Sequence, residues 1–332
     1  MTGPDPDSLR EHLEEAILGD PPQLTAGEVS DAAGVSIDDA RRLWRALGFP
    51  DAEGSTAFTE GDARALSLLA EARRRGIGDD AVVRMTRAVG STMSRLAEWQ
   101  VSNLVAMYAA GRDTQLRPEE SIALTQDLVE RLTPTFDDLL VYAWRRHLAA
   151  AVTRAEMLQV DETHLTTATI GFADLVRFTA LSNELDQEEI GDLVEVFEAR
   201  CHDVVADRRG RVIKSLGDSV LFVADAPRDA LDIALDIIGV IGKDLRLPDV
   251  RVGLATGPTV LRMGDVFGPA VNLASRLTGV ARRNRVIIDQ ETAGLLPGEE
   301  FETRPLPARP LRGFGDVVPV AVRRTRPRHG DE

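Results

Sequence analysis

Two different periodicities of apolar residues divide this chain near its middle. In the first half, apolar residues recur every three or four positions, which is the spacing of amphipathic helices. Glycine or proline separates the runs. The predicted helices cover residues 8–18, 26–34, 37–47, 60–75, 79–107, 119–132 and 136–157. Few runs are typical of strands, so the first half is predicted to be an all-helical domain.

Short apolar runs alternate with longer helical patterns in the second half. Predicted strands cover residues 167–172, 211–215, 220–224, 250–255, 259–263, 285–289 and 317–323, and predicted helices cover 187–207, 227–244 and 269–281. Strands interleaved with long helices indicate an α+β sandwich whose helices cover a sheet. The stretch between the two patterns carries charges without a sustained apolar period, which is typical of a linker.

Composition changes at the same place. All Trp and Tyr residues precede residue 150, whereas both lysines, Lys214 and Lys243, follow it. The chain is therefore interpreted as a helical domain over residues 1–155, a linker over 156–165, a second domain over 166–326 and a disordered tail over 327–332. Among so many arginines, a lysine at a candidate site indicates that a compact ammonium is needed there.

Charge and cysteine content narrow the class of protein. The net charge is −15 and both halves are acidic, so neither favours a polyanion, and nucleic acid is not an expected partner. The single cysteine, Cys201, excludes an intrachain disulfide and fits a reducing compartment. The N-terminus does not resemble a signal peptide, and no apolar run reaches the roughly 18 residues that cross a bilayer. A cytoplasmic protein without a membrane partner is predicted.

Two carboxylates lie at the ends of predicted strands. Asp174 follows the strand 167–172, and Asp218 lies in a Gly-Asp turn between two apolar strands. Each has an ordinary explanation, because Asp often caps a helix and Gly-Asp often forms a hairpin turn. If the strands are neighbours, the two side chains form a site for two metal ions of the kind that clamps a phosphoryl transfer.

Asn272 and Arg276 lie one helical turn apart in the predicted helix 269–281, so both project from one face. The same helix also has an amphipathic core stripe, which consists of Leu273, Ala274, Leu277 and Val280. Both interpretations can hold together, because the polar pair lies off that stripe.

Four strings resemble, in order and spacing, the catalytic domain of class III adenylyl cyclases. They are GFADLVRFTALS, VIKSLGDSVLF, VRVGLATG and GDVFGPAVNLASRLTGVA, and the resemblance covers residues 166–325. It implies a ferredoxin-like α+β catalytic domain after an all-α regulatory domain. The implied enzyme is an adenylate cyclase, a phosphorus-oxygen lyase that converts ATP to 3′,5′-cyclic AMP and pyrophosphate.

The resemblance also implies roles for residues of this sequence. Asp174, Leu175 and Asp218 correspond to the metal site, which would hold two Mg²⁺ or Mn²⁺ ions. Lys214 would donate to adenine N1, and Asp265 would accept from the exocyclic N6 amine.

The remaining implied roles concern the ribose and the phosphates. Asn272 would position the ribose, and Arg276 would stabilise charge on the α-phosphate in the transition state. Phe178 and Thr179 would bind substrate at the phosphate turn. Arg312 would be a β/γ-phosphate ligand, although a surface arginine in a turn is an equally good explanation.

Two further expectations follow from the resemblance. Domains of this family act as head-to-tail pairs with composite sites, and all six polar positions occur in this one chain, so a homodimer with two equivalent sites is implied. Arg177 occupies a place where the family commonly has glycine, and its side chain is predicted to be exposed to solvent.

The segment 25–49 reads as helix, glycine turn, helix, and resembles the helix-turn-helix start of MerR-type regulators. A DNA reader would display Arg41, Arg42 and Arg45 on its second helix. The negative charge of this half favours a regulatory and dimerisation domain instead. The alternative function is a DNA-binding transcription regulator with a nucleotide-sensing cyclase-like domain. A diguanylate cyclase is disfavoured, because its GG(D/E)EF turn is replaced by Leu-Gly-Asp-Ser-Val from residue 216.

Overall fold

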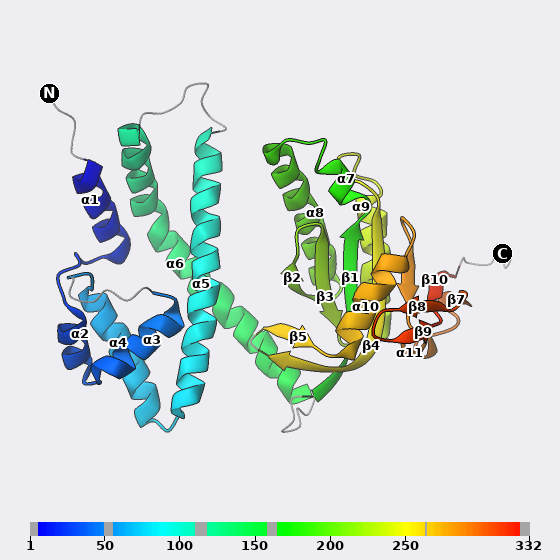
Figure 1. The fold of residues 1–332 in the computed structure, drawn as a ribbon, viewed down its shortest axis with the longest axis horizontal. Coiled ribbons are helices and arrows are strands. Elements are labelled where there is room, and N and C mark those ends of the chain that lie inside the picture. The colour runs from blue at the N-terminus through cyan, green and yellow to red at the C-terminus, as the bar shows by residue number, and fades with distance from the viewer. Residues whose placement is uncertain (1–5, 50–55, 110–117, 158–164, 263, 326–332) are drawn as a thin grey trace, which may run out of the picture. The chain divides into compact units, whose positions relative to one another are not determined.

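The computed structural model describes residues 6–49, 56–109, 118–157, 165–262 and 264–325 (Figure 1). The chain divides into two compact units, Met1–Ala151 and Val152–Glu332. Most of the predicted linker and the predicted tail, 327–332, lie outside the described residues. No helix within the described ranges is long and apolar enough to span a membrane.

The first unit is helical, as predicted. Its helices are α1 (Pro6–Leu18), α2 (Ala26–Ala33), α3 (Ile37–Leu47), α4 (Glu60–Arg74), α5 (Asp79–Ala109) and α6 (Pro118–Met157), the last of which continues into the second unit. Thr25 and Thr59 form capping boxes that begin α2 and α4. The core contains Val29, Leu43 and Leu66, and Trp44 stacks on Phe58 with ring centroids 4.4 Å apart.

The helix α5 lies close to the end of α3 at Gly90. A Cβ atom at this position would lie 2.2 Å from the carbonyl oxygen of Leu47, so no larger residue fits without a shift. The glycine therefore allows α5 to pack directly against the end of α3.

One prediction in this unit was wrong. The sequence predicted separate helices over 119–132 and 136–157 with a break at Pro134, whereas α6 runs through Pro134 without interruption. A proline removes one N–H donor and crowds the preceding turn. A helix of 40 residues retains enough other hydrogen bonds to continue past that loss.

The second unit is built on one mixed sheet. Its strands are β1 (Leu165–Leu175), β2 (Arg211–Ser215), β3 (Ser219–Ala224), β4 (Val250–Arg262), β6 (Val286–Ile288), β7 (Phe301–Pro305) and β10 (Val320–Arg324), with β5 (Asp265–Phe267) paired to β4. The order is β2-β3-β1-β4-β6-β10-β7, and β1 is antiparallel to both β3 and β4. The first four strands and the helices between them make the predicted ferredoxin-like α+β arrangement.

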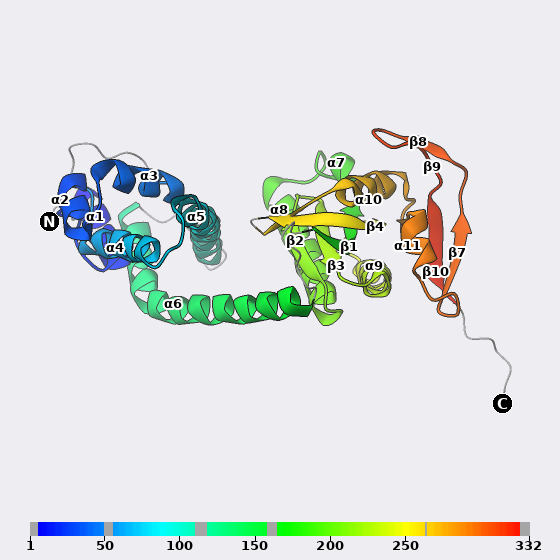
Figure 2. The same cartoon turned by 90° about the horizontal axis from the view of Figure 1, so that it is seen from below.

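Helices cover both faces of this sheet (Figures 1 and 2). The helices α8 (Gln187–Asp207) and α9 (Pro227–Ile241) pack on one face, where Phe197, Cys201 and Ile237 are buried. On the other face, α10 (Pro269–Val280) packs through Ala274 and Leu277. The remaining elements are the short helices α7 (Phe178–Leu181) and α11 (Gln290–Gly294) and a small hairpin of β8 (Arg309–Leu311) and β9 (Gly315–Val317).

Several strand boundaries differ from the predictions. The strand β1 extends to Leu175, so Asp174 lies within the strand and not after it. The predicted strands 250–255 and 259–263 are one strand, β4, which passes through Gly257 and Pro258. β5, β7 and β8 were not predicted. They are short or carry exposed polar residues, so they lack the apolar runs on which the prediction depended.

Candidate active site

Asp174 points to the α10 face of the sheet, because side chains alternate along a strand and Ile170 and Phe172 pack on that face. Its register partners are Ser219 on β3 and Arg251 on β4. Its carboxylate accepts a hydrogen bond of 2.9 Å from Ser219 Oγ and one of 2.7 Å from Arg251 Nε. Asp174 is therefore held by strands on both sides.

Asp218 lies beside this carboxylate, in the turn between β2 and β3. Gly217 allows the turn through a left-handed backbone with φ of 70°. The carbonyl of Asp218 accepts from Leu175 N–H at 2.9 Å, which fixes the turn against the end of β1. Burial raises the pKa of Asp218, and the charge of Asp174 raises it further. The structure thus brings the two predicted carboxylates together, and we call Asp174 and Asp218 the carboxylate edge.

Arg251 is a residue of this site that the sequence analysis missed. Its guanidinium is half-buried, pairs with Asp174 and also donates to the carbonyl of Gly279 at 3.4 Å. The available signal was a single charge inside the apolar run 250–255. That charge can be placed beside Asp174 only when the register of β1 and β4 is known.

Lys214 and Asp265 meet at a distance of 2.6 Å between Nζ and Oδ2. A β-bulge makes this possible, because β2 has an extra residue, Ile213, between the register partners Val212 and Lys214. The extra residue turns Lys214 to the α10 face, opposite Leu221. Burial tends to raise the pKa of Asp265, but hydrogen bonds from Lys214 and from Val266 N–H outweigh it and lower the pKa. We call Lys214 and Asp265 the base-reading pair, after the role that the resemblance implies for them.

Asn272 and Arg276 project from α10 into solvent, as their spacing predicted. Within the described ranges, neither side chain has a hydrogen bond or an ion pair. The core stripe of the same helix is also present, since Ala274 and Leu277 are fully buried. The helix therefore fixes the backbone of the pair and leaves both functional groups open to a ligand or to another chain.

The turn after β1 explains the departure at Arg177. This residue has φ of 62°, a left-handed conformation that favours glycine, and its side chain is exposed as predicted. Phe178 and Thr179 begin α7 directly afterwards, and Phe178 packs on the core. The Leu175 side chain is buried, so only its main-chain carbonyl could serve as a metal ligand.

Arg312 lies in the turn between β8 and β9 and is exposed. No interaction joins it to the carboxylate edge or to the base-reading pair within the described ranges. Two surface hollows of about 440 and 460 Å³ lie beside α8, and neither is lined by a candidate site residue.

The chemistry of the carboxylate edge fits a divalent metal. Carboxylate oxygens are the ligands that Mg²⁺ and Mn²⁺ prefer, and Arg251 forms an ion pair with one of the two carboxylates, that of Asp174. Among the described residues, no group of three or more His, Cys, Asp or Glu side chains could hold a metal ion. Further ligands would have to come from the main chain, from water or from the substrate.

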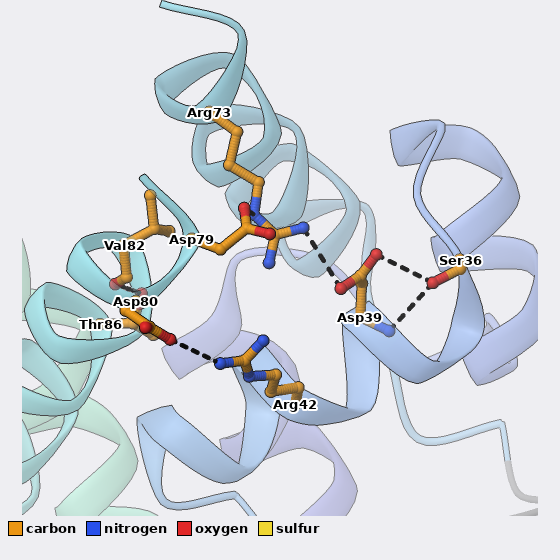
Figure 3. A network of polar contacts seen from close by, with 8 residues as sticks. All are labelled: Ser36, Asp39, Arg42, Arg73, Asp79, Asp80, Val82 and Thr86. Carbon is orange, nitrogen blue, oxygen red and sulfur yellow. Dashed lines mark hydrogen bonds and ion pairs between the residues drawn. The ribbon is translucent and has the colours of Figure 1, made fainter. Parts of the chain in front are cut away.

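The helix-turn-helix segment gives little support to DNA reading (Figure 3). Arg42 is paired with Asp80 of α5 at 3.2 Å, and Arg45 Nε donates to the carbonyl of Arg41. Arg73 also bridges Asp39 of α3 and Asp79 of α5 (Figure 3). These contacts hold α3 against α4 and α5, which favours a structural role for its charged residues.

Comparisons with known proteins identify relatives of this chain. The family described as "Adenylate and Guanylate cyclase catalytic domain" matches residues 160–322. An adenylate cyclase of Streptomyces coelicolor is 39% identical over 351 residues, covering 97% of this chain and 91% of that protein. Adenylate cyclases of Streptomyces griseus (41% identity, 86% of this chain, 71% of that protein) and Glutamicibacter nicotianae (34%, 96% and 83%) are also similar.

Proposed function

The chain belongs to the class III adenylyl cyclases, and on this premise we propose that it makes cyclic AMP with two divalent metal ions at sites shared between two copies. Adenylate cyclase activity itself, the conversion of ATP to cyclic AMP and pyrophosphate, follows from relatives that are 34–41% identical over most of the chain. The proposal concerns the metals, the site residues, the dimer and the regulation.

The observation that carries the proposal is the carboxylate edge. Two adjacent carboxylates, one of them with a raised pKa, leave negative charge that one arginine does not neutralise. Divalent ions bound there would activate the ribose 3′-hydroxyl and neutralise charge on the triphosphate. Arg251 balances Asp174 before substrate arrives, and its guanidinium would then be available to phosphate oxygens.

The base-reading pair accounts for the choice of ATP. The Lys214 ammonium is a donor for adenine N1, and the Asp265 carboxylate is an acceptor for the N6 amine. Guanine presents the opposite polarity at these two positions, so the same pair would disfavour GTP. Because the two side chains already hold each other at 2.6 Å, they are positioned before the base binds.

Asn272 and Arg276 complete the proposed chemistry from the second copy. Asn272 orients the ribose, and Arg276 stabilises charge at the α-phosphate. Their exposure on α10 supports this role, since a group that acts in another subunit's site must project from its own. Phe178, Thr179 and Arg312 are proposed as weaker contacts to the phosphates.

Mixing two inactive variants tests the composite site. Asp174→Ala and Asn272→Ala each lack one essential group, and a mixed dimer has one site with both lesions and one with neither. Random exchange of subunits makes half of the dimers mixed, so about one quarter of the wild-type rate is expected. No recovery, despite subunit exchange shown with differently labelled chains, would place each site within one chain.

The helical unit is proposed to regulate the enzyme through the geometry of the dimer. The helix α6 ends at Met157, and β1, which carries Asp174, begins at Leu165. A rotation of α6 is thus passed on over a short path, and a shift of about 1 Å misaligns a composite site. Residues 156–332 alone should differ several-fold in rate from the full chain, in a cyclic AMP assay across pH. If residues 156–332 and the full chain had equal rates and equal responses to pH, the first unit would not regulate catalysis.

A further inference from the structure

Arg251 contacts two elements of the second unit that the proposed function assigns to different sites. Its half-buried guanidinium pairs with the Asp174 carboxylate at 2.7 Å, and its Nη1 donates to the carbonyl of Gly279 at 3.4 Å. Asp174 belongs to the carboxylate edge, whereas Gly279 lies in the last turn of α10. One side chain thus joins the carboxylate edge to the helix that carries Asn272 and Arg276.

The guanidinium lies between two negative groups. The last carbonyls of a helix have no partner within the helix, and they give its C-terminus a partial negative charge. The helix α10 ends at Val280, so the carbonyl of Gly279 is one of these groups. Without the cation of Arg251, the end of α10 would face the Asp174 carboxylate directly, and the two would repel each other.

The last turn of α10 also rests directly on the sheet. Gly253 of β4 lies under this turn, where a Cβ atom would clash with the main-chain nitrogen of Thr278. The Thr278 hydroxyl donates to the carbonyl of Phe172 on β1 at 3.3 Å. The position of the last turn is therefore set by β1 and β4 together, and Arg251 is the charged contact at its end.

Arg276 is close enough to this end to depend on it. It lies three residues before Gly279, which is about 4.5 Å along the helix axis. Helix ends fray when their carbonyls lose their partners. Loss of the hydrogen bond from Arg251 would therefore loosen the turn on which Arg276 stands.

We infer that Arg251 is a positioning residue for the site of the other copy, because it fixes the end of α10 from which Arg276 acts. The inference rests on the proposed function, in which α10 of one copy completes the site of the other. Each Arg251 then serves two sites. It balances Asp174 at its own carboxylate edge, and through α10 it orients Arg276 for the neighbouring site.

Mixed dimers with a single active site separate these two roles. One copy, the helix donor, carries Asp218→Ala, which disables its carboxylate edge but retains Asp174, Arg251 and α10. The other copy, the edge donor, carries Asn272→Ala, which disables its α10. Two different affinity tags isolate the mixed dimer. Its one active site consists of the carboxylate edge of the edge donor and α10 of the helix donor.

Arg251→Gln in the helix donor is the decisive variant, because that arginine lies beside the disabled edge. It should lower kcat for cyclic AMP formation by about three- to tenfold and leave KM for ATP unchanged, since the displaced group acts in the transition state. Arg211→Gln in the helix donor is the matched control, since it breaks the ion pair with Asp225 and should change neither value. An unchanged kcat with Arg251→Gln would overturn the inference.

A double-mutant cycle distinguishes positioning from general damage to the fold. Arg276→Ala in the helix donor should lower kcat by itself. Adding Arg251→Gln to the same copy should then have little further effect, because Arg251 acts through Arg276. Damage to the fold would instead multiply the two losses, and that result would overturn the inference.

Hydrogen exchange measures the stability of the last turn without any activity. In the metal-free full chain, Arg251→Gln should speed the exchange of the amides of residues 277–280 by a larger factor than those of α8. Arg211→Gln should leave the exchange of residues 277–280 unchanged. Equal exchange of these amides in the parent and in the Arg251→Gln chain would contradict the inference.

The same dimers separate the inference from the proposed function. If the mixed dimer with Arg251 intact in both copies is inactive, the composite site is wrong and the inference falls with it. If that dimer is active and Arg251→Gln in the helix donor has no effect, the composite site stands and the inference does not.

Discussion

Lys214 and Asp265 form an ion pair with each other, whereas Arg251 forms an ion pair with Asp174 and, among the described residues, none with Asp218. The pKa of Asp265 is lowered by its partner, and the pKa of Asp218 is raised by burial and by the neighbouring carboxylate. The charges of the base-reading pair are thus matched in the free chain, while the carboxylate edge retains negative charge. In the proposed function, the first region reads a neutral base and the second receives a cation.

Substitutions at the carboxylate edge should have the largest effect on the rate of cyclic AMP formation. Asp174→Asn and Asp218→Asn should each lower the rate of cyclic AMP formation by about 10³-fold or more, because several kcal/mol of charge stabilisation depends on the bound metal. The rate is measured with saturating Mn²⁺, and circular dichroism checks the fold. Asp225→Asn is the control, since Asp225 pairs with Arg211 away from the site. A near-normal rate in either site variant would contradict the metal assignment.

The base-reading pair should give a smaller loss. Lys214→Glu together with Asp265→Cys removes the proposed donor and acceptor for adenine, which costs about 1–3 kcal/mol, or roughly 5- to 150-fold in kcat/KM for ATP. The measurement is kcat/KM for ATP and for GTP. Lys243→Glu changes the only other lysine and should leave both values unchanged. An unaltered preference for ATP in the double variant would mean that the pair does not contact the base.

Arg251→Gln tests the same difference between the two regions through the free energy of unfolding. Without the guanidinium, Asp174 is left partly buried beside Asp218 with no cation, so the metal-free protein should lose about 1–3 kcal/mol of unfolding free energy at neutral pH. Mn²⁺ should restore part of the loss, because it replaces the missing positive charge. Urea denaturation with and without Mn²⁺ measures both effects. Arg211→Gln, which breaks another ion pair, should lose less and should not respond to Mn²⁺.

On the free energy of unfolding, Asp218→Asn should have a smaller effect than Arg251→Gln, and in the opposite direction. A raised pKa in the folded state means that the favourable protonated form is lost as the pH rises through that value, so ionised Asp218 lowers stability at neutral pH. The asparagine variant should therefore be more stable at pH 7 without metal, by less than about 1 kcal/mol, because solvent screens a partly exposed carboxylate. Below the ordinary pKa of aspartate the gain should vanish. If the variant were no more stable than the parent at pH 7, ionised Asp218 would not lower the free energy of unfolding.

The sequence predicted the fold well where apolar periods were long. The helices α3 and α8 and the strand β2 have the predicted bounds. Two predicted pairs of side chains also lie together, Asp174 with Asp218 and Lys214 with Asp265. The continuity of α6 through Pro134 was missed, because a local rule about proline was opposed by the hydrogen bonds of a long helix. Arg251 was missed because its role depends on strand register, which no local pattern encodes.

The left-handed backbone at Arg177 illustrates the same limit. The resemblance to the family implied that glycine is common at this position, but only the φ of 62° explains why glycine suits it. Likewise, the sequence placed Lys214 and Asp265 as a pair without showing how β2 turns Lys214 toward Asp265. Residue types and spacing indicated the candidate site residues, whereas the directions of their side chains depended on the backbone.

The bulge at Ile213 makes the position of Lys214 depend on the register of β2 as well as on the identity of its residues. A shift of one residue in a strand reverses which face each following side chain occupies. If Ile213 paired with Leu221 in a regular ladder, Lys214 would face α8 and α9, away from Asp265, with the same residues present. A change of register at one position would thus separate Lys214 from Asp265 without altering either residue.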